Sequence, residues 1–79
     1  MNIVYKIVGT THAGNTSTWP FECETARRAH DVLRYELVHG GYHLTANDVS
    51  QATMYSEQGL PVIRNVSIFK EIKVVKCVH

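Results

Sequence analysis

The sequence predicts an α+β fold, in which an antiparallel β-sheet of about three to five strands carries one main α-helix packed on one face. Three stretches lead to this prediction. Residues 2–10 read as a strand with two faces, residues 25–39 repeat apolar side chains at helical spacing, and residues 62–78 are rich in β-branched residues. The predicted order is strand, strand, helix, an element that is either helix or strand, and then one or two strands. The whole chain, residues 1–79, is short enough to be one domain.

The first two strands are expected to form a hairpin. Residues 2–10 are dominated by β-branched and aromatic side chains, which favour a strand. Residues 11–17 contain Gly, Asn and small polar residues, which are typical of a turn. Residues 18–23 form the second predicted strand. Because Pro20 has no N–H to donate, we expect this strand at an edge of the sheet or distorted.

The main helix is predicted from about residue 25 to residue 39. Thr25 is the expected N-cap, and Gly40 with Gly41 ends the helix. The side chains predicted to face the core are Ala26, Ala29, Leu33 and Leu37, with Val32 on their flank. The side chains predicted on the far side are Arg27, Asp31, Arg34 and Val38.

The region after the helix allows two interpretations. Residues 45–48 fit a capping box, which favours a short helix through about Ala52. Alternation over residues 49–55 would instead give a strand. Further on, residues 62–78 are too long for one ordinary strand, so a break near residues 64–65 or 70–71 would divide them into two. The first and last strands have apolar residues on both faces and are therefore expected at the centre of the sheet.

Composition and charge exclude several classes of protein. The net charge of +1 argues against a dedicated duplex-DNA binder, which usually shows a clear basic excess. The largest basic excess, a net charge of +3, lies in residues 64–79, and residues 27–41 sum to +1. No signal peptide or run of about 18 apolar residues is present, so the expected location is the cytoplasm. The two cysteines, Cys23 and Cys77, form no CxxC motif and are expected to be reduced.

No motif for catalysis or for a cofactor is found, so we expect neither an enzyme nor a cofactor. His39 and His43 have a spacing that suits a metal only on a continuous helix, and glycines interrupt that helix. Cys77 and His79 form at most a weak pair at the end of the sequence, so no metal site is predicted. Cys23 could be a nucleophile at the start of the main helix, but a small buried hydrophobe is the favoured interpretation.

Several surfaces could bind a partner. On the main helix the candidates are Arg27, Arg28, Arg34 and Tyr35, because arginine and tyrosine are common in interface hot spots. On the sheet, Lys6 and Lys73 are candidates beside a possible aromatic platform for bases made of Tyr5, Trp19, Phe21 and Tyr55. The sheet face away from the helix would show Val4, Val8, Val75 and Cys77. Such a patch implies a partner, a second copy of the chain in a homodimer, or cover by residues 42–60.

The organisation of the chain resembles that of the small anti-CRISPR proteins made by phages. The resemblance is carried by the strand residues 5–8, a polar loop, residues 21–29 running from a strand straight into the helix, and C-terminal strands. It covers most of the chain as a pattern of elements without a diagnostic motif. It implies a non-enzymatic inhibitor that covers a surface of a CRISPR effector complex in the host cytoplasm. Because the chain is not acidic, it differs from the members that mimic DNA.

The sequence therefore predicts a non-enzymatic, protein-binding inhibitor or adaptor. The alternative is a small nucleic-acid-binding module that uses the basic helix face and the C-terminal lysines. A cysteine-dependent enzyme is the third and least favoured interpretation. Nothing in the sequence indicates a membrane partner.

Overall fold

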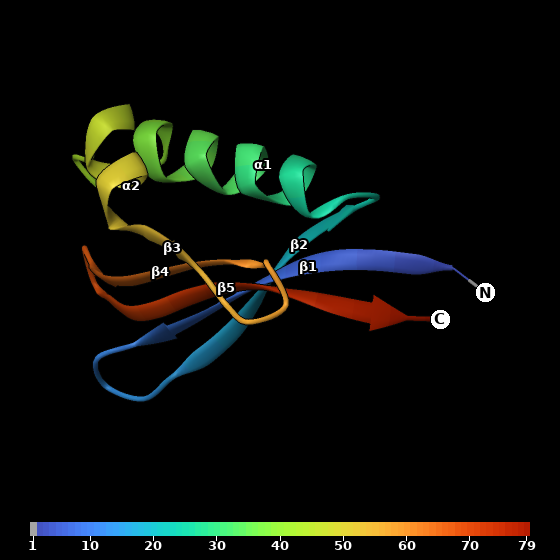
Figure 1. Cartoon of the computed structure of the whole chain (residues 1–79). Helices are drawn as coiled ribbons and strands as arrows, with labels where there is room; N and C mark the ends of the chain where they lie inside the picture. The colour runs from blue at the N-terminus through green and yellow to red at the C-terminus, as the bar shows by residue number, and fades with distance from the viewer. Residues whose placement is uncertain (1) are drawn as a thin grey trace.

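The computed structural model describes residues 2–79 and confirms the α+β fold. The elements are β1 (Ile3–Thr11), β2 (Thr16–Cys23), α1 (Ala26–His39), α2 (Ala46–Ala52), β3 (Thr53–Tyr55), β4 (Pro61–Val66) and β5 (Phe69–Val78). The strands form one antiparallel sheet in the order β2-β1-β5-β4-β3. Both helices lie over the same side of this sheet (Figure 1). The molecule therefore has two layers and one sheet face without a helix.

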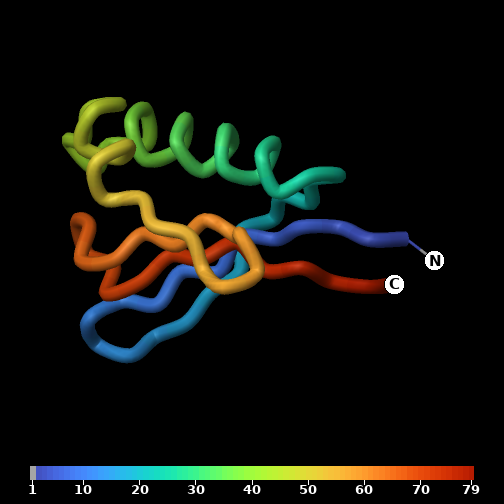
Figure 2. The backbone as a smooth tube through the Cα atoms, viewed as in Figure 1, coloured from blue at the N-terminus to red at the C-terminus, as the bar shows by residue number. Residues whose placement is uncertain are grey.

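The first and last strands pair with each other near the centre of the sheet, as their apolar residues predict. The β1–β5 ladder runs from Ile3 opposite Val78 to Thr11 opposite Phe69. Beyond it, Asn2 and His79 exchange two backbone hydrogen bonds of 3.2 and 2.8 Å. The two ends of the chain consequently leave the sheet side by side (Figure 2).

The strand that contains Pro20 is an edge strand with an irregular register, so both expectations for it are confirmed. Lys6 lies opposite Glu22, but Val8 lies opposite Thr18, which leaves extra β2 residues around Pro20. An irregularity of this kind accommodates a residue that cannot donate a ladder hydrogen bond.

The predicted stripe of α1 forms the centre of the core. Thr25 caps the helix, because its side chain accepts a hydrogen bond of 3.0 Å from the backbone N–H of Arg28. Ala29, Leu33 and Leu37 are fully buried. The sheet residues buried with them are Ile7, Cys23, Ile63, Val66, Phe69, Ile72 and Val74, and α2 adds Val49.

One helix position differs from the prediction. Val38 was expected on the solvent side of α1, but it is half-buried and packs against the core. The reason is that α2 lies against the same end of α1, and Ala46 and Val38 line one shallow hollow. The prediction of which α1 residues face the sheet is correct, but α2 covers the side of α1 that carries Val38.

The uncertain region contains both predicted elements in succession. The capping box is formed: the backbone of Thr45 donates to Asp48 at 2.8 Å, and the backbone of Asp48 donates to Thr45 Oγ1 at 3.1 Å. The helix ends at Ala52, and Thr53–Tyr55 continues as the edge strand β3. This region lies on the α1 side, so α2 does not cover the opposite sheet face (Figure 1).

The break in the C-terminal run is at neither of the two predicted positions. β4 and β5 are joined by the two-residue loop of Ser67 and Ile68, with Val66 opposite Phe69 and Arg64 opposite Glu71. Val66 and Phe69 are both buried, so the core fixes the register of this hairpin. Ser67 has φ 54°, a conformation that usually calls for glycine or asparagine, and the sequence therefore gives a weak turn signal there.

Candidate functional site

The candidate partner-binding residues lie on two opposite sides of the molecule. Arg27, Arg28, Arg34 and Tyr35 are exposed on α1 outside its buried stripe, and we call this surface the outer face of α1. Lys6 and Lys73 lie on the sheet face that carries no helix, which we call the open sheet face. A single flat partner surface cannot contact both sets at once.

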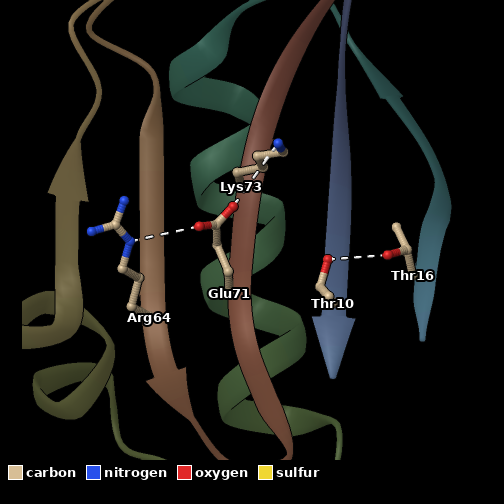
Figure 3. A network of polar contacts seen from close by, with 5 residues as sticks. All are labelled: Thr10, Thr16, Arg64, Glu71 and Lys73. Carbon is tan, nitrogen blue, oxygen red and sulfur yellow. Dashed lines mark hydrogen bonds and ion pairs between the residues drawn. The ribbon is translucent and has the colours of Figure 1, made fainter. Parts of the chain in front are cut away.

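The charges of the open sheet face are paired with one another. Lys6 Nζ lies 3.3 Å from Glu22 Oε1. Glu71 accepts from both sides, at 3.6 Å from Arg64 Nε and 3.9 Å from Lys73 Nζ (Figure 3). Exposed pairs of this kind contribute little to stability. They do, however, hold the two candidate lysines against carboxylates of the same chain.

An apolar strip runs between these ion pairs. Val4 and Val8 of β1 and Val75 and Cys77 of β5 are half-buried on the open sheet face. Residues 56–60 rim one corner of this face, where they line a hollow of about 460 Å³ together with Val62 and neighbouring residues. The expected cover by residues 42–60 is therefore limited to that corner.

The arginines of α1 have no acidic partner within the described chain. Over residues 2–79, no carboxylate lies within 4.0 Å of Arg27, Arg28 or Arg34. Helical spacing alone would pair Arg27 with Asp31, but that ion pair is not formed. The guanidinium groups are consequently available to an external acceptor.

These arginines also divide between two hollows. Arg27 and Arg34 line a hollow of about 420 Å³ between α1 and the segment from β3 to the start of β4; its other lining residues are Ala26, His30, Asp31, Tyr55, Gly59 and Pro61. We call it the α1–β3 hollow. Arg28 and Tyr35 line a separate, smaller hollow, which shares Asp31 with the first. The sequence alone had placed all three arginines on one binding surface.

His30 and Tyr55 are site residues that the sequence did not place beside the arginines. The His30 ring is partly buried, 6.5 Å from the Tyr55 ring between centroids and 3.5 Å from Thr53 Oγ1 through Nε2. Burial lowers the pKa of His30, Asp31 raises it, and Arg34 lowers it further. The spacing of residues 27, 30 and 34 gives one helix stripe, but only the position of β3 brings Tyr55 to it.

The aromatic residues do not form an exposed platform. Trp19 packs on Phe69 with ring centroids 5.6 Å apart, and both Trp19 and Tyr5 contact the core. Tyr55 lies at the opposite edge of the sheet, on β3. Trp19 and Tyr5 are therefore packing residues, as expected for aromatics at strand spacing, whereas Tyr55 is 63% exposed.

The cysteines lie on opposite faces of the sheet, and both are free. Cys23 is buried in the core opposite Tyr5, whereas Cys77 is half-buried on the open sheet face opposite Val4. Among residues 2–79, no group of three or more His, Cys, Asp or Glu side chains is arranged to hold a metal ion. Nor is any helix in that range long and apolar enough to cross a membrane.

Comparisons with known proteins add no relative to this picture. No protein-family model matches the chain, and no match to a curated protein or to a solved structure was found. The arguments for function consequently rest on the residues of the chain.

Proposed function

We propose that the chain is a non-enzymatic protein-binding module, an inhibitor or adaptor that docks on a larger protein through the outer face of α1. The observation that carries the proposal is the set of exposed arginines without an acidic partner in residues 2–79, accompanied by Tyr35, which is 64% exposed. Arginine and tyrosine are enriched in interface hot spots, because they combine a large contact area with directional hydrogen bonds.

The helix that carries these residues is held rigidly. Three of its side chains are fully buried in the core, and Thr25 caps its N-terminus. Because the helix backbone is already ordered, binding costs only the ordering of its exposed side chains, which favours affinity. The partner surface that complements this face carries carboxylates, since guanidinium groups bind them in a two-pronged geometry.

The resemblance to phage anti-CRISPR proteins identifies a CRISPR effector complex as the first partner to test. The experiment measures cleavage of target DNA by purified effector complexes with increasing amounts of the chain. We expect the wild type to inhibit at least one effector type. The double variant Arg27→Ala/Arg28→Ala should lose about tenfold or more in affinity, the usual effect of removing hot-spot side chains.

A matched control distinguishes an effect of the α1 arginines from an effect of the overall positive charge. Lys70→Ala/Lys76→Ala removes two exposed positive charges from β5 and none from α1, and should inhibit as the wild type does. If the arginine variant also binds as well as the wild type, docking through α1 is ruled out. The open sheet face around Val4, Lys6, Lys73 and Val75 then becomes the surface to test, for a partner or for a second copy of the chain.

The second candidate function is nucleic-acid binding, and the same unpaired arginines favour it. The two functions differ in their response to salt. Contacts to phosphates release counterions, so binding to an oligonucleotide would weaken steeply as salt rises, whereas a packed protein interface would weaken much less. Titrations of a DNA and an RNA oligonucleotide at two salt concentrations decide between them.

A further inference from the structure

We propose that the α1–β3 hollow is a binding site for a terminal phosphoryl group, that is, a phosphate monoester. The inference does not need the docking function proposed above, although Arg27 and Arg34 belong to both surfaces. The hollow brings together side chains from two separate elements: Arg27, His30 and Arg34 of α1, and Tyr55 of β3. Its volume of about 420 Å³ exceeds that of a phosphate alone and leaves room for the organic part of an ester.

The positions of the two arginines favour a phosphoryl group over a carboxylate. They are seven residues apart on one helix, a rise of about 10 Å, and His30 lies between them. A carboxylate has two coplanar oxygens, which one guanidinium group already occupies. A phosphoryl group has three terminal oxygens around a tetrahedral centre and can accept from both arginines and from a third side. Tyr55 lines the hollow from β3, and its hydroxyl can act as that third donor.

Asp31 is the one acidic side chain that lines the hollow. It lies on the same helix stripe, four residues after Arg27 and three before Arg34, yet forms no ion pair with either within 4.0 Å. In a hollow with two guanidinium groups, its charge reduces the attraction for an anion without cancelling it. Removing the charge of Asp31 should therefore strengthen phosphate binding, which a variant damaged in folding would not do.

His30 provides a local reporter of occupancy. The groups that face or adjoin its ring are Arg27, Asp31 and Arg34 on α1, and Thr53 and Tyr55 on β3. Its pKa is lowered by burial, which favours the neutral ring. A phosphoryl dianion in the hollow stabilises the charged imidazolium and raises that pKa. The chemical shifts of the His30 ring should consequently change with ligand, while those of His12 and His79, outside the hollow, should not.

The test is an NMR titration of the isotopically labelled protein with inorganic phosphate, phosphoserine and adenosine monophosphate. We expect all three to shift His30, and Arg27→Ala/Arg34→Ala to weaken the affinity at least tenfold. Asp31→Asn should strengthen it several-fold. The control Arg28→Ala/Lys70→Ala removes the same charge outside the hollow and should bind as the wild type does.

The outcomes are distinct. Tighter binding of phosphoserine assigns the phosphoryl group to a modified side chain, and tighter binding of the nucleotide assigns it to a small metabolite; either result supports the site. Absence of binding by all three probes overturns the proposal. The proposal is also overturned if the control variant loses as much affinity as Arg27→Ala/Arg34→Ala. The same holds if an oligonucleotide that has only phosphodiesters binds as tightly as the three probes. Failure of the docking function alone would leave these titrations unchanged, because they need no protein partner.

Discussion

The ring of Phe69 lies directly against the backbone of Gly9. A Cβ atom at Gly9 would be 3.0 Å from Phe69 Cε1 and 3.8 Å from Trp19 Cη2. The missing side chain of this residue makes room for the Trp19–Phe69 pair, which joins the edge strand β2 to the start of β5. Close packing therefore favours glycine at position 9, within a strand where glycine is otherwise unfavourable.

The first prediction follows from this contact. Gly9→Val should lower the free energy of unfolding by about 1–3 kcal/mol, because the added branches displace the Phe69 ring. Gly9→Ala should have a smaller effect in the same direction. Chemical denaturation measures both. The control is Thr18→Val, which places a valine at an exposed position of β2. It should change stability little.

A second prediction compares two positions of α1. Leu33→Ala should cost about 2–5 kcal/mol, since Leu33 is fully buried at the centre of the core. Val38→Ala removes a smaller, half-buried side chain and should cost about 1 kcal/mol. Equal losses in urea denaturation would contradict the described packing of the helix.

The third prediction concerns the thiols. In the folded protein, an alkylating reagent should modify Cys77 and leave Cys23 unmodified, because Cys23 is only 6% exposed. After unfolding, both should react, since cysteines on opposite faces of the sheet cannot form a disulfide. Intact-mass spectrometry counts the adducts. The variant Cys23→Ser/Cys77→Ser should keep partner binding if it folds, and loss of binding in a folded variant would revive a role for the thiols.

The fourth prediction concerns the capping box of α2. Thr45→Ala should lower stability by about 1 kcal/mol, as for other N-cap residues. The hydrogen bond from the backbone of Thr45 lowers the pKa of Asp48. The stabilisation from Asp48 is therefore complete above its unfolded pKa and is lost as pH falls through the lower folded pKa. Asp48→Asn should flatten the acid side of a plot of stability against pH, whereas Ser50→Ala, on the same helix, should not.

Much of the fold could be predicted from the sequence because its signals are local. The stripe of α1, the capping box at Thr45 and the edge position of Pro20 each follow from the preferences of a few neighbouring residues. The turn at Ser67 was missed because Val66 and Phe69 fix it through the core, without strong turn residues of its own. Tertiary contacts outweighed the local signal there.

The candidate sites were less predictable for a related reason. The sequence identified the arginines of the helix, but not that Arg28 faces one hollow while Arg27 and Arg34 face another. That division depends on where β3 and the segment after it lie against α1. Likewise, the ion pairs of Lys6 and Lys73 depend on cross-strand register, which joins residues far apart in the chain.

The pairing of β1 with β5 also has a kinetic consequence. The ladder at the centre of the sheet joins the two ends of the chain, so most of the chain must be closed into a loop before it forms. Such non-local pairing slows folding relative to a helical protein of the same size. During synthesis on a ribosome, β1 lacks this partner until β5 has emerged. The β1–β2 hairpin is then the earliest sheet structure available to the nascent chain.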